Sequence, residues 1–194
     1  MHKAEQHHIG QNSYSSGKLA AKLLDFGTLK GDTLLVLHLE REVYNSEHLV
    51  QKEKGFRDYF KGKKKKKITI EQLTFSNLDS IKKKRAFIKY ALKQFPNLSG
   101  VFVTTSKIHR VISEFINLSN RHLNFIGFDL IEKNLKLFKN GENFFLINQN
   151  PSEQGYLGIM SIYNYLLNDT PSPQTQYLPI DVVMKENVEF YSDS

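Results

Sequence analysis

Two polar side chains stand at the ends of apolar runs, where such groups can hold a ligand. The first run, Leu123 to Leu130, is rich in aromatic residues and contains one acid, Asp129; the second, Phe144 to Gln149, ends in amide side chains. Each run is typical of a buried parallel strand. Because open α/β sheets bind ligands at the carboxyl ends of their strands, Asp129 and Gln149 are candidate ligand contacts.

Motifs that would indicate catalysis, a metal or a cofactor are missing from the sequence. No phosphate-binding glycine loop, nucleophile elbow or helical pair of zinc-binding histidines occurs, and there is no cysteine. His38 and His109 fall inside a predicted strand and a predicted helix, where a hydrogen-bonded structural role is expected. Since Asp129 has no identifiable acid–base partner, we expect a binding protein without metal or cofactor, not an enzyme.

The elements that would position Asp129 and Gln149 alternate between strand and helix. The most continuously apolar run, Asp32 to Leu39, is the expected central strand. Further strands are expected at 68–73, 100–104, 123–130, 144–149 and 176–184, and helices at 15–27, 48–60, 78–95, 107–118 and 152–167. This alternation predicts an α/β fold with a doubly wound, mainly parallel sheet. Apolar residues in the segment 131–143 have no regular spacing, so no element is predicted there.

The distribution of charged and apolar residues indicates which classes of partner this chain is expected to bind. The 194 residues carry a net charge of +7, yet without the ten cations in Lys61–Lys67 and Lys82–Arg85 the charge would be −3. We interpret these two clusters as solvated surface, because aromatic residues are not interleaved with them as in single-strand nucleic acid binders. No run is long enough to cross a membrane, and the polar segment 1–9 does not resemble a secretory signal and is expected to be poorly ordered.

Five segments, taken in this order, resemble the effector-binding region of LacI-type transcriptional repressors, whose fold type I periplasmic sugar-binding proteins share. The segments are Asn-Ser-Tyr-Ser-Ser-Gly-Lys-Leu-Ala-Ala-Lys-Leu-Leu from residue 12, Lys-Glu-Lys-Gly-Phe-Arg-Asp-Tyr-Phe from 52, Gly-Val-Phe-Val-Thr-Thr-Ser from 100, Phe-Ile-Gly-Phe-Asp from 125 and Asn-Gln-Asn-Pro-Ser-Glu-Gln-Gly-Tyr from 148. The resemblance extends from about residue 9 to residue 191.

The resemblance implies one lobe of a two-lobed protein. Residues 10–130 would form the C-terminal lobe, 131–175 a crossover and a helix belonging to the other lobe, and 176–194 the final strand and tail. The hinge crossings would lie near Gln11, Phe145 and Pro173. The DNA-binding headpiece of the family is absent from this chain, and the helix from Ser152 would lack its usual sheet. We therefore expect its apolar stripe to be buried by another chain, through formation of a homodimer or through a swapped element.

The resemblance also implies ligand contacts, residue by residue. Asp129 matches the aspartate that binds sugar hydroxyls in the family, and Gln149 matches a polar residue beside the ligand. Lys52 falls where the family commonly has an arginine, so a bidentate contact is lost.

Four further residues complete the expected site. Thr105, followed by Ser106, replaces a frequent Asn-Asp pair at its strand end. Asn45, Ser46 and His48 lie where the family has its effector loop. Carboxylate, amide and hydroxyl groups suit a polyol because they pair with adjacent hydroxyls.

The function implied is effector sensing, for a sugar or sugar derivative, by a cytoplasmic LacI-type regulator that reaches operator DNA only through the absent headpiece. Effector binding would shift the population of hinge angles and so the operator affinity. One alternative is a solute receptor of a sugar transporter or sensor kinase. Another is a flavodoxin-like enzyme that uses Asp129 with His48 or His38.

Overall fold

A six-stranded sheet forms the centre of the molecule in the computed structural model, which describes residues 8–40, 43, 46–63, 66–140, 142, 144–168 and 173–191. Its strands are β2 (Thr33–His38), β3 (Thr69–Thr74), β4 (Leu98–Val103), β5 (Asn124–Phe128), β6 (Phe145–Asn148) and β8 (Asp181–Val183). The spatial order is β3-β2-β4-β5-β6-β8, and only the β6–β8 pair is antiparallel. The predicted mainly parallel sheet is confirmed.

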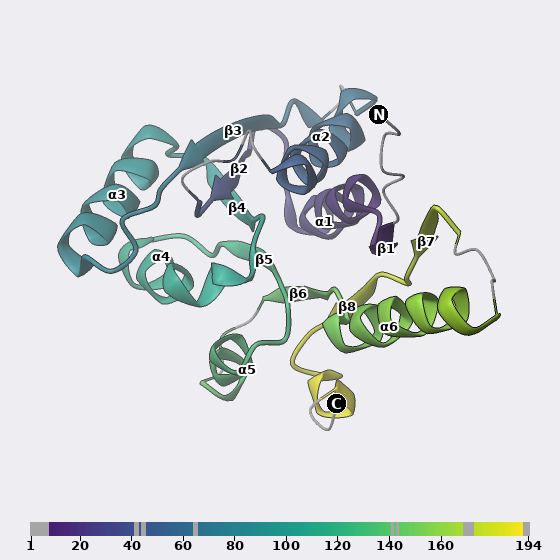
Figure 1. Ribbon diagram of the computed structural model, residues 1–194. Coiled ribbons are helices and arrows are strands. Elements are labelled where there is room, and N and C mark those ends of the chain that lie inside the picture. The colour runs from purple at the N-terminus through teal and green to yellow at the C-terminus, as the bar shows by residue number, and fades with distance from the viewer. Residues whose placement is uncertain are drawn as a thin grey trace.

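Helices cover both faces of this sheet (Figure 1). They are α1 (Ser13–Gly27), α2 (Glu47–Lys61), α3 (Ile81–Gln94), α4 (Ile112–Leu118) and α5 (Glu132–Lys139). Alternate residues of β2 face opposite sides, since Leu34 and Val36 pack with α1 and α2 whereas Leu35 and Leu37 pack with α3, α4 and α5. Every residue of β2 is buried. The chain therefore has the predicted doubly wound α/β fold.

The structure corrects several predicted elements. The strand expected to be central, β2, lies second from the edge of the sheet. The helix expected at 107–118 is a 3-10 helix, η2 (Ser106–Arg110), followed by α4. Residues 131–143, in which apolar residues show no regular spacing, contain α5, which buries Leu137 and Phe138. The strand expected at 176–184 is two strands in different sheets, because Pro179 lies between β7 (Thr175–Tyr177) and β8.

A second, smaller unit consists of β1 (His8–Gly10), β7 and α6 (Pro151–Asn168), which lie together at one end of the molecule (Figure 1). β1 pairs with β7 in parallel, so residues 8 and 9 of the expected unordered segment are ordered, while residues 1–7 lie outside the described part. A short 3-10 helix, η3 (Val188–Tyr191), closes the described chain.

The chain passes between the two units at three points. Gln11 follows β1, Asn148 ends β6 and Pro179 precedes β8. The amide Nε2 of Gln11 donates to the carbonyl oxygen of Asn148 and, at 2.7 Å, to that of Pro179. These hydrogen bonds tie all three crossings together. The hinge expected near Phe145 and Pro173 thus corresponds to crossings that lie a few residues later in the chain.

Part of the lysine run folds back onto the protein at the opposite end of the sheet. Lys63 and Lys66 place their ammonium groups 2.5 Å and 2.8 Å from the carboxylate of Asp25, and the Tyr59 hydroxyl donates to it at 2.9 Å. Burial alone would raise the pKa of Asp25, but these hydrogen bonds outweigh burial and hold it well below its ordinary value of 3.8. These two lysines therefore neutralise an internal acid.

Replacing Asp25 by asparagine is expected to destabilise the fold by about 2 kcal/mol at pH 7, because hydrogen bonds to a charged group are lost. Since the pKa is lowered in the fold, the carboxylate stabilises the protein above pH 3.8 and loses this effect as the pH falls below that value. Urea unfolding of wild type and variant at pH 7 and pH 3 measures both effects. Equal stabilities at pH 7 would contradict this account.

Candidate functional site

Three residues predicted from the sequence form one hydrogen-bonded chain at the carboxyl ends of the strands. The amide Nε2 of Gln149 donates to both carboxylate oxygens of Asp129, at 2.8 and 3.0 Å. The ammonium Nζ of Lys52 donates to Oε1 of the same amide at 3.3 Å, although the two residues are 97 positions apart. The fold thus joins a carboxylate, an amide and an ammonium group side by side.

Lys52 reaches this position because α1 and α2 cross at very short distance. A Cβ at Gly17 would lie 1.9 Å from the carbonyl oxygen of Lys52, and one at Gly55 would lie 2.0 Å from that of Tyr14, so only glycine allows this crossing. The Lys52 side chain is buried and also donates to the carbonyl oxygen of Thr104 at 3.3 Å.

The environment of Lys52 lowers its pKa. Its Nζ lies 3.4 Å from the centroid of the Phe128 ring. Burial lowers the pKa of Lys52 to about 8, and the charge of Asp129 offsets only part of this effect. Asp129 and Lys52 are thus linked through the Gln149 amide, which lies between them.

The backbone at Asp129 is held in an uncommon conformation. Its φ is +66°, in the left-handed region, which aspartate tolerates better than most residues. The buried amide of Asn134 donates to the carbonyl oxygens of Phe128, Asp129 and Ser106 at 2.9 to 3.0 Å. Asn134 therefore fixes the end of β5 against η2. Sequence reasoning missed this residue because the helix that carries it, α5, was not predicted.

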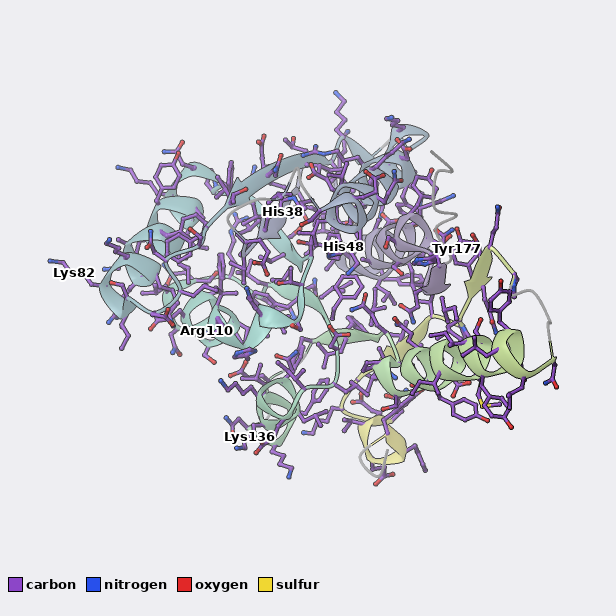
Figure 2. All side chains as sticks on the ribbon, in the orientation of Figure 1. His38, His48, Lys82, Arg110, Lys136 and Tyr177 are labelled. Carbon is purple, nitrogen blue, oxygen red and sulfur yellow. The ribbon has the colours of Figure 1, made fainter. Side chains whose placement is uncertain are left out.

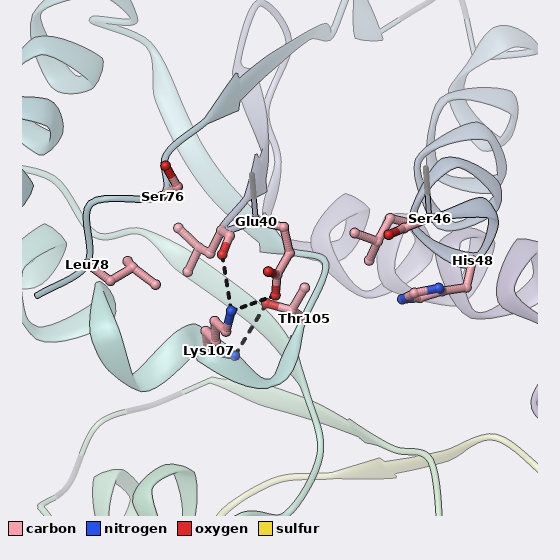
Figure 3. Close-up of a pocket in the computed structure, with 9 residues that line it drawn as sticks. Glu40, Ser46, His48, Ser76, Leu78, Thr105 and Lys107 are labelled. Atoms are coloured by element: carbon pink, nitrogen blue, oxygen red, sulfur yellow. Dashed lines mark hydrogen bonds and ion pairs between the residues drawn. The ribbon is translucent and has the colours of Figure 1, made fainter. Parts of the chain in front are cut away.

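A pocket of about 460 Å³ contains three more predicted residues, Ser46, His48 and Thr105. Figure 3 shows Ser46 and His48 on one side, Ser76 and Leu78 on the other, and Thr105 between them. The remaining lining residues are Leu39, Glu40, Leu49 and Lys107. Sequence reasoning missed Glu40 and Lys107, although Glu40 closely follows a predicted strand, the signal that identified Asp129.

His48 connects this pocket electrostatically with the hydrogen-bonded chain. Burial lowers the pKa of His48, the charge of Lys52 lowers it further, and the charge of Glu40 opposes both effects. His48 is therefore neutral at pH 7. It also lines a second pocket of about 740 Å³ together with Tyr177. Asn45, the last predicted site residue, lies outside the described residues.

Both histidines expected to be structural are hydrogen-bonded. The buried His38 contacts the Thr104 hydroxyl through Nδ1 at 2.9 Å and the Glu53 carboxylate through Nε2 at 2.8 Å. Because a carboxylate only accepts, we assign the proton to Nε2. His109 contacts the Asn134 side-chain oxygen at 2.9 Å. His38 and His109 therefore support strand ends near the site.

The described residues contain no cluster of three or more His, Cys, Asp or Glu side chains able to hold a metal ion. None of the helices formed by these residues is long and apolar enough to cross a membrane. The pocket is lined by polar side chains, which can form directed hydrogen bonds, and by Leu39, Leu49 and Leu78.

A doubly wound sheet with polar groups at its strand ends defines a ligand-binding α/β domain. Residues 2–170 match the family model described as a periplasmic binding protein domain, and the chain belongs to this family. A comparison with curated protein sequences finds no match.

Solved structures with the same fold include a protein described as a regulator and others described as binding proteins. A protein described as "a putative LacI transcriptional regulator" from Bacteroides fragilis is 26% identical, with a TM-score of 0.82 over 95% of this chain and 64% of that chain. A glucose-galactose binding protein from Geobacillus stearothermophilus is 16% identical, with a TM-score of 0.75 over 96% of this chain and 65% of that chain. The chain thus spans less than two thirds of either structure.

One further relative was solved with a sugar. A periplasmic solute binding protein of an ABC transporter from Actinobacillus succinogenes, with bound D-allose, is 22% identical, with a TM-score of 0.75 over 96% of this chain and 64% of that chain. These similar proteins are described as sugar-binding or regulatory proteins, not as enzymes.

Proposed function

We propose that this chain is the effector-sensing part of a LacI-type transcriptional regulator and that its effector is a sugar or sugar derivative. The observation that carries the proposal is the hydrogen-bonded chain of Lys52, Gln149 and Asp129 at the ends of the strands. It offers an acceptor, an amide and a donor in one row, which suits the adjacent hydroxyls of a polyol.

The individual contacts follow from the chemistry of each group. Asp129 accepts hydrogen bonds from sugar hydroxyls, Gln149 both donates and accepts, and the Lys52 ammonium group donates. Ser46, His48 and Thr105 add uncharged polar contacts from the pocket. Asn45 is proposed as a further contact from the loop before α2.

The similarity to one solved structure supports a regulator over its alternative. The 26% identical relative is described as a LacI-type regulator, and its TM-score is higher than those of the two sugar-binding relatives described above. The alternative, a solute receptor of a sugar transporter or sensor kinase, is favoured by the binding proteins among the similar structures.

The proposed mechanism is a shift between hinge angles. Gln11 holds the three crossings together through the carbonyl oxygens of Asn148 and Pro179. A ligand that contacts both units favours one angle between them, because it binds that state more tightly. A DNA-binding headpiece would convert this angle into operator affinity in the cytoplasm.

Homodimer formation is part of the proposal. No described residue of α6 is buried, and Ile159, Ile162 and Leu166 are 63 to 72% exposed. Their spacing of three and four residues places them on one stripe. We infer that a second copy of this chain covers the stripe. Residues 131–175 are proposed to be the crossover and the helix that belong to the other lobe of a two-lobed protein, and residues 176–194 the final strand and tail.

Introducing aspartate at Ile162 is expected to weaken self-association by about 100-fold or more, because an unpaired charge would be buried in the interface. Sedimentation velocity of the 194-residue chain measures this effect. The control is Ile81→Asp, since Ile81 is 70% exposed on α3, in the other unit. A wild-type protein that stays monomeric, or equal association of both variants, would contradict the dimer.

The coding DNA upstream of Met1 distinguishes the two functions. An open frame that continues into a lobe-sized segment and a helix-turn-helix is expected for a regulator. A frame that begins with a signal peptide would overturn the regulator and favour the receptor.

A further inference from the structure

Glu40 and Lys107 form an ion pair at the centre of the 460 Å³ pocket (Figure 3). The Lys107 Nζ lies 2.6 Å from Oε1 of Glu40 and 3.5 Å from the carbonyl oxygen of Leu39. The Lys107 backbone N–H donates to the Thr105 hydroxyl at 3.4 Å. Lys107 is therefore held by residues that follow β2 and β4, and it in turn holds the Glu40 carboxylate.

The position of this pair in the fold is the one best suited to a ligand. Glu40 follows β2, and Lys107 follows β4, which is the neighbour of β2. From β2 the chain goes on to β3 on one side, and from β4 to β5 on the other, so the sheet reverses its order here. Ligands of open α/β sheets bind outside such a switch point.

A role in stability alone does not explain the pair. The Glu40 and Lys107 side chains are 36% and 38% exposed, and ion pairs this exposed contribute about 0–1 kcal/mol. Both groups also keep hydrogen-bonding capacity, because a carboxylate has about four acceptor sites and an ammonium group has three donors. A ligand that covers the pair would exclude water and strengthen these bonds.

Among the described residues of the pocket and of the hydrogen-bonded chain, opposite charges are paired. Glu40 pairs with Lys107, Asp129 faces Lys52, and His48 is neutral at pH 7. A charged ligand would leave its own charge without a partner, which is costly once water is excluded. The ends of β2 and β5 are two strand spacings apart, or about 10 Å, which one sugar ring with a hydrogen bond at each end spans.

Building on the proposed function, we infer that Glu40 and Lys107 form a second polar subsite that reads two adjacent hydroxyls of a neutral, single-ring sugar. Asp129 and Gln149 hold the other end of the ring. Glu40 accepts from one hydroxyl while Lys107 donates to its neighbour. The Leu39, Leu49 and Leu78 side chains form the apolar part of the pocket.

The test compares Lys107→Met and Glu40→Gln with Lys136→Met. Lys136 is a suitable control because it is also ion-paired, at 2.7 Å to Glu132, yet lies on the outside of α5 (Figure 2). Isothermal titration calorimetry of the full-length protein with D-allose, D-arabinose, D-glucose and myo-inositol measures the affinities. Each pocket variant is expected to bind the tightest sugar about 10- to 100-fold more weakly.

Selectivity separates a direct contact from a general effect. One monodeoxy analogue of the tightest sugar should bind wild type about 10-fold or more weakly but bind Lys107→Met as well as the parent sugar does. Lys136→Met should behave as wild type. Melting temperatures of both pocket variants should stay close to that of wild type, since the exposed pair adds little stability.

The outcomes distinguish this inference from the proposed function. If wild type binds a sugar but both pocket variants bind it equally well, with the same preference among deoxy analogues, the second subsite is wrong and the proposed function stands. Tighter binding of D-glucuronate than of D-glucose would overturn the neutral ligand. A wild type that binds none of the sugars overturns the proposed function and the subsite together.

Discussion

Replacing Asp129 by asparagine is expected to weaken sugar binding by about 100-fold or more, since a carboxylate that accepts from two hydroxyls contributes about 3 kcal/mol. Asparagine keeps the size of the side chain and tolerates the left-handed backbone at this position, where φ is +66°. It also turns one oxygen that accepts from Gln149 into a donor. Calorimetric titration with the tightest-bound sugar measures the loss.

The control for this variant is Asp79→Asn, which removes a carboxylate that is 99% exposed and pairs with Arg110 at 2.6 Å. Both variants should unfold at urea concentrations close to that of wild type. Equal sugar affinities of Asp129→Asn and wild type would contradict the proposed contact.

Replacing Lys52 by methionine is expected to stabilise the fold by about 1–2 kcal/mol at pH 7 while it weakens sugar binding. Lys52 is 2% exposed, and its charge is costly to bury. Methionine removes this cost but leaves the carbonyl oxygen of Thr104 and the amide oxygen of Gln149 without their donor. The buried charge of Lys52 therefore lowers the stability of the fold.

The pH dependence of the same variant has a definite sign. The pKa of Lys52 is about 8 in the fold and 10.5 in the unfolded chain. Below pH 8 the lysine is charged in both states, so the full cost of burying the charge is present. Between pH 8 and 10.5 the folded protein has released the proton while the unfolded chain still holds it, so the stability of wild type rises by about 3 kcal/mol relative to Lys52→Met.

Urea unfolding at pH 7, 8.5 and 10 measures this difference. The gain in stability of Lys52→Met over wild type should shrink or reverse as the pH rises. Lys136→Met is the control, because Lys136 is 65% exposed. Parallel pH profiles of wild type and Lys52→Met would contradict the buried charge.

The hydrophobic pattern of the sequence predicts most of the fold. β2 is apolar throughout because both faces are covered, and the helices α1, α2 and α3 show the spacing of residues that pack on one side. α5 escaped prediction because a helix of eight residues repeats its apolar spacing too few times. The pairing of β1 with β7 is invisible to local patterns, because it joins residues 8–10 to residues 175–177.

Local sequence patterns predict some residues of the candidate site but not others. Asp129 and Gln149 follow apolar runs, so a rule about strand ends finds them. The resemblance to LacI-type proteins adds Lys52, which lies inside a helix where no local pattern distinguishes it. The pairing of Glu40 with Lys107 depends on two strands being neighbours in the sheet, and only the three-dimensional structure gives that adjacency.

A crystal structure of the protein grown with its tightest-bound sugar tests the central claim most directly. Sugar hydroxyl oxygens are expected about 2.5–3.2 Å from the Asp129 carboxylate and the Gln149 amide. A sugar bound elsewhere, or one whose hydroxyls leave Asp129 and Gln149 paired only with each other, would contradict the proposed site.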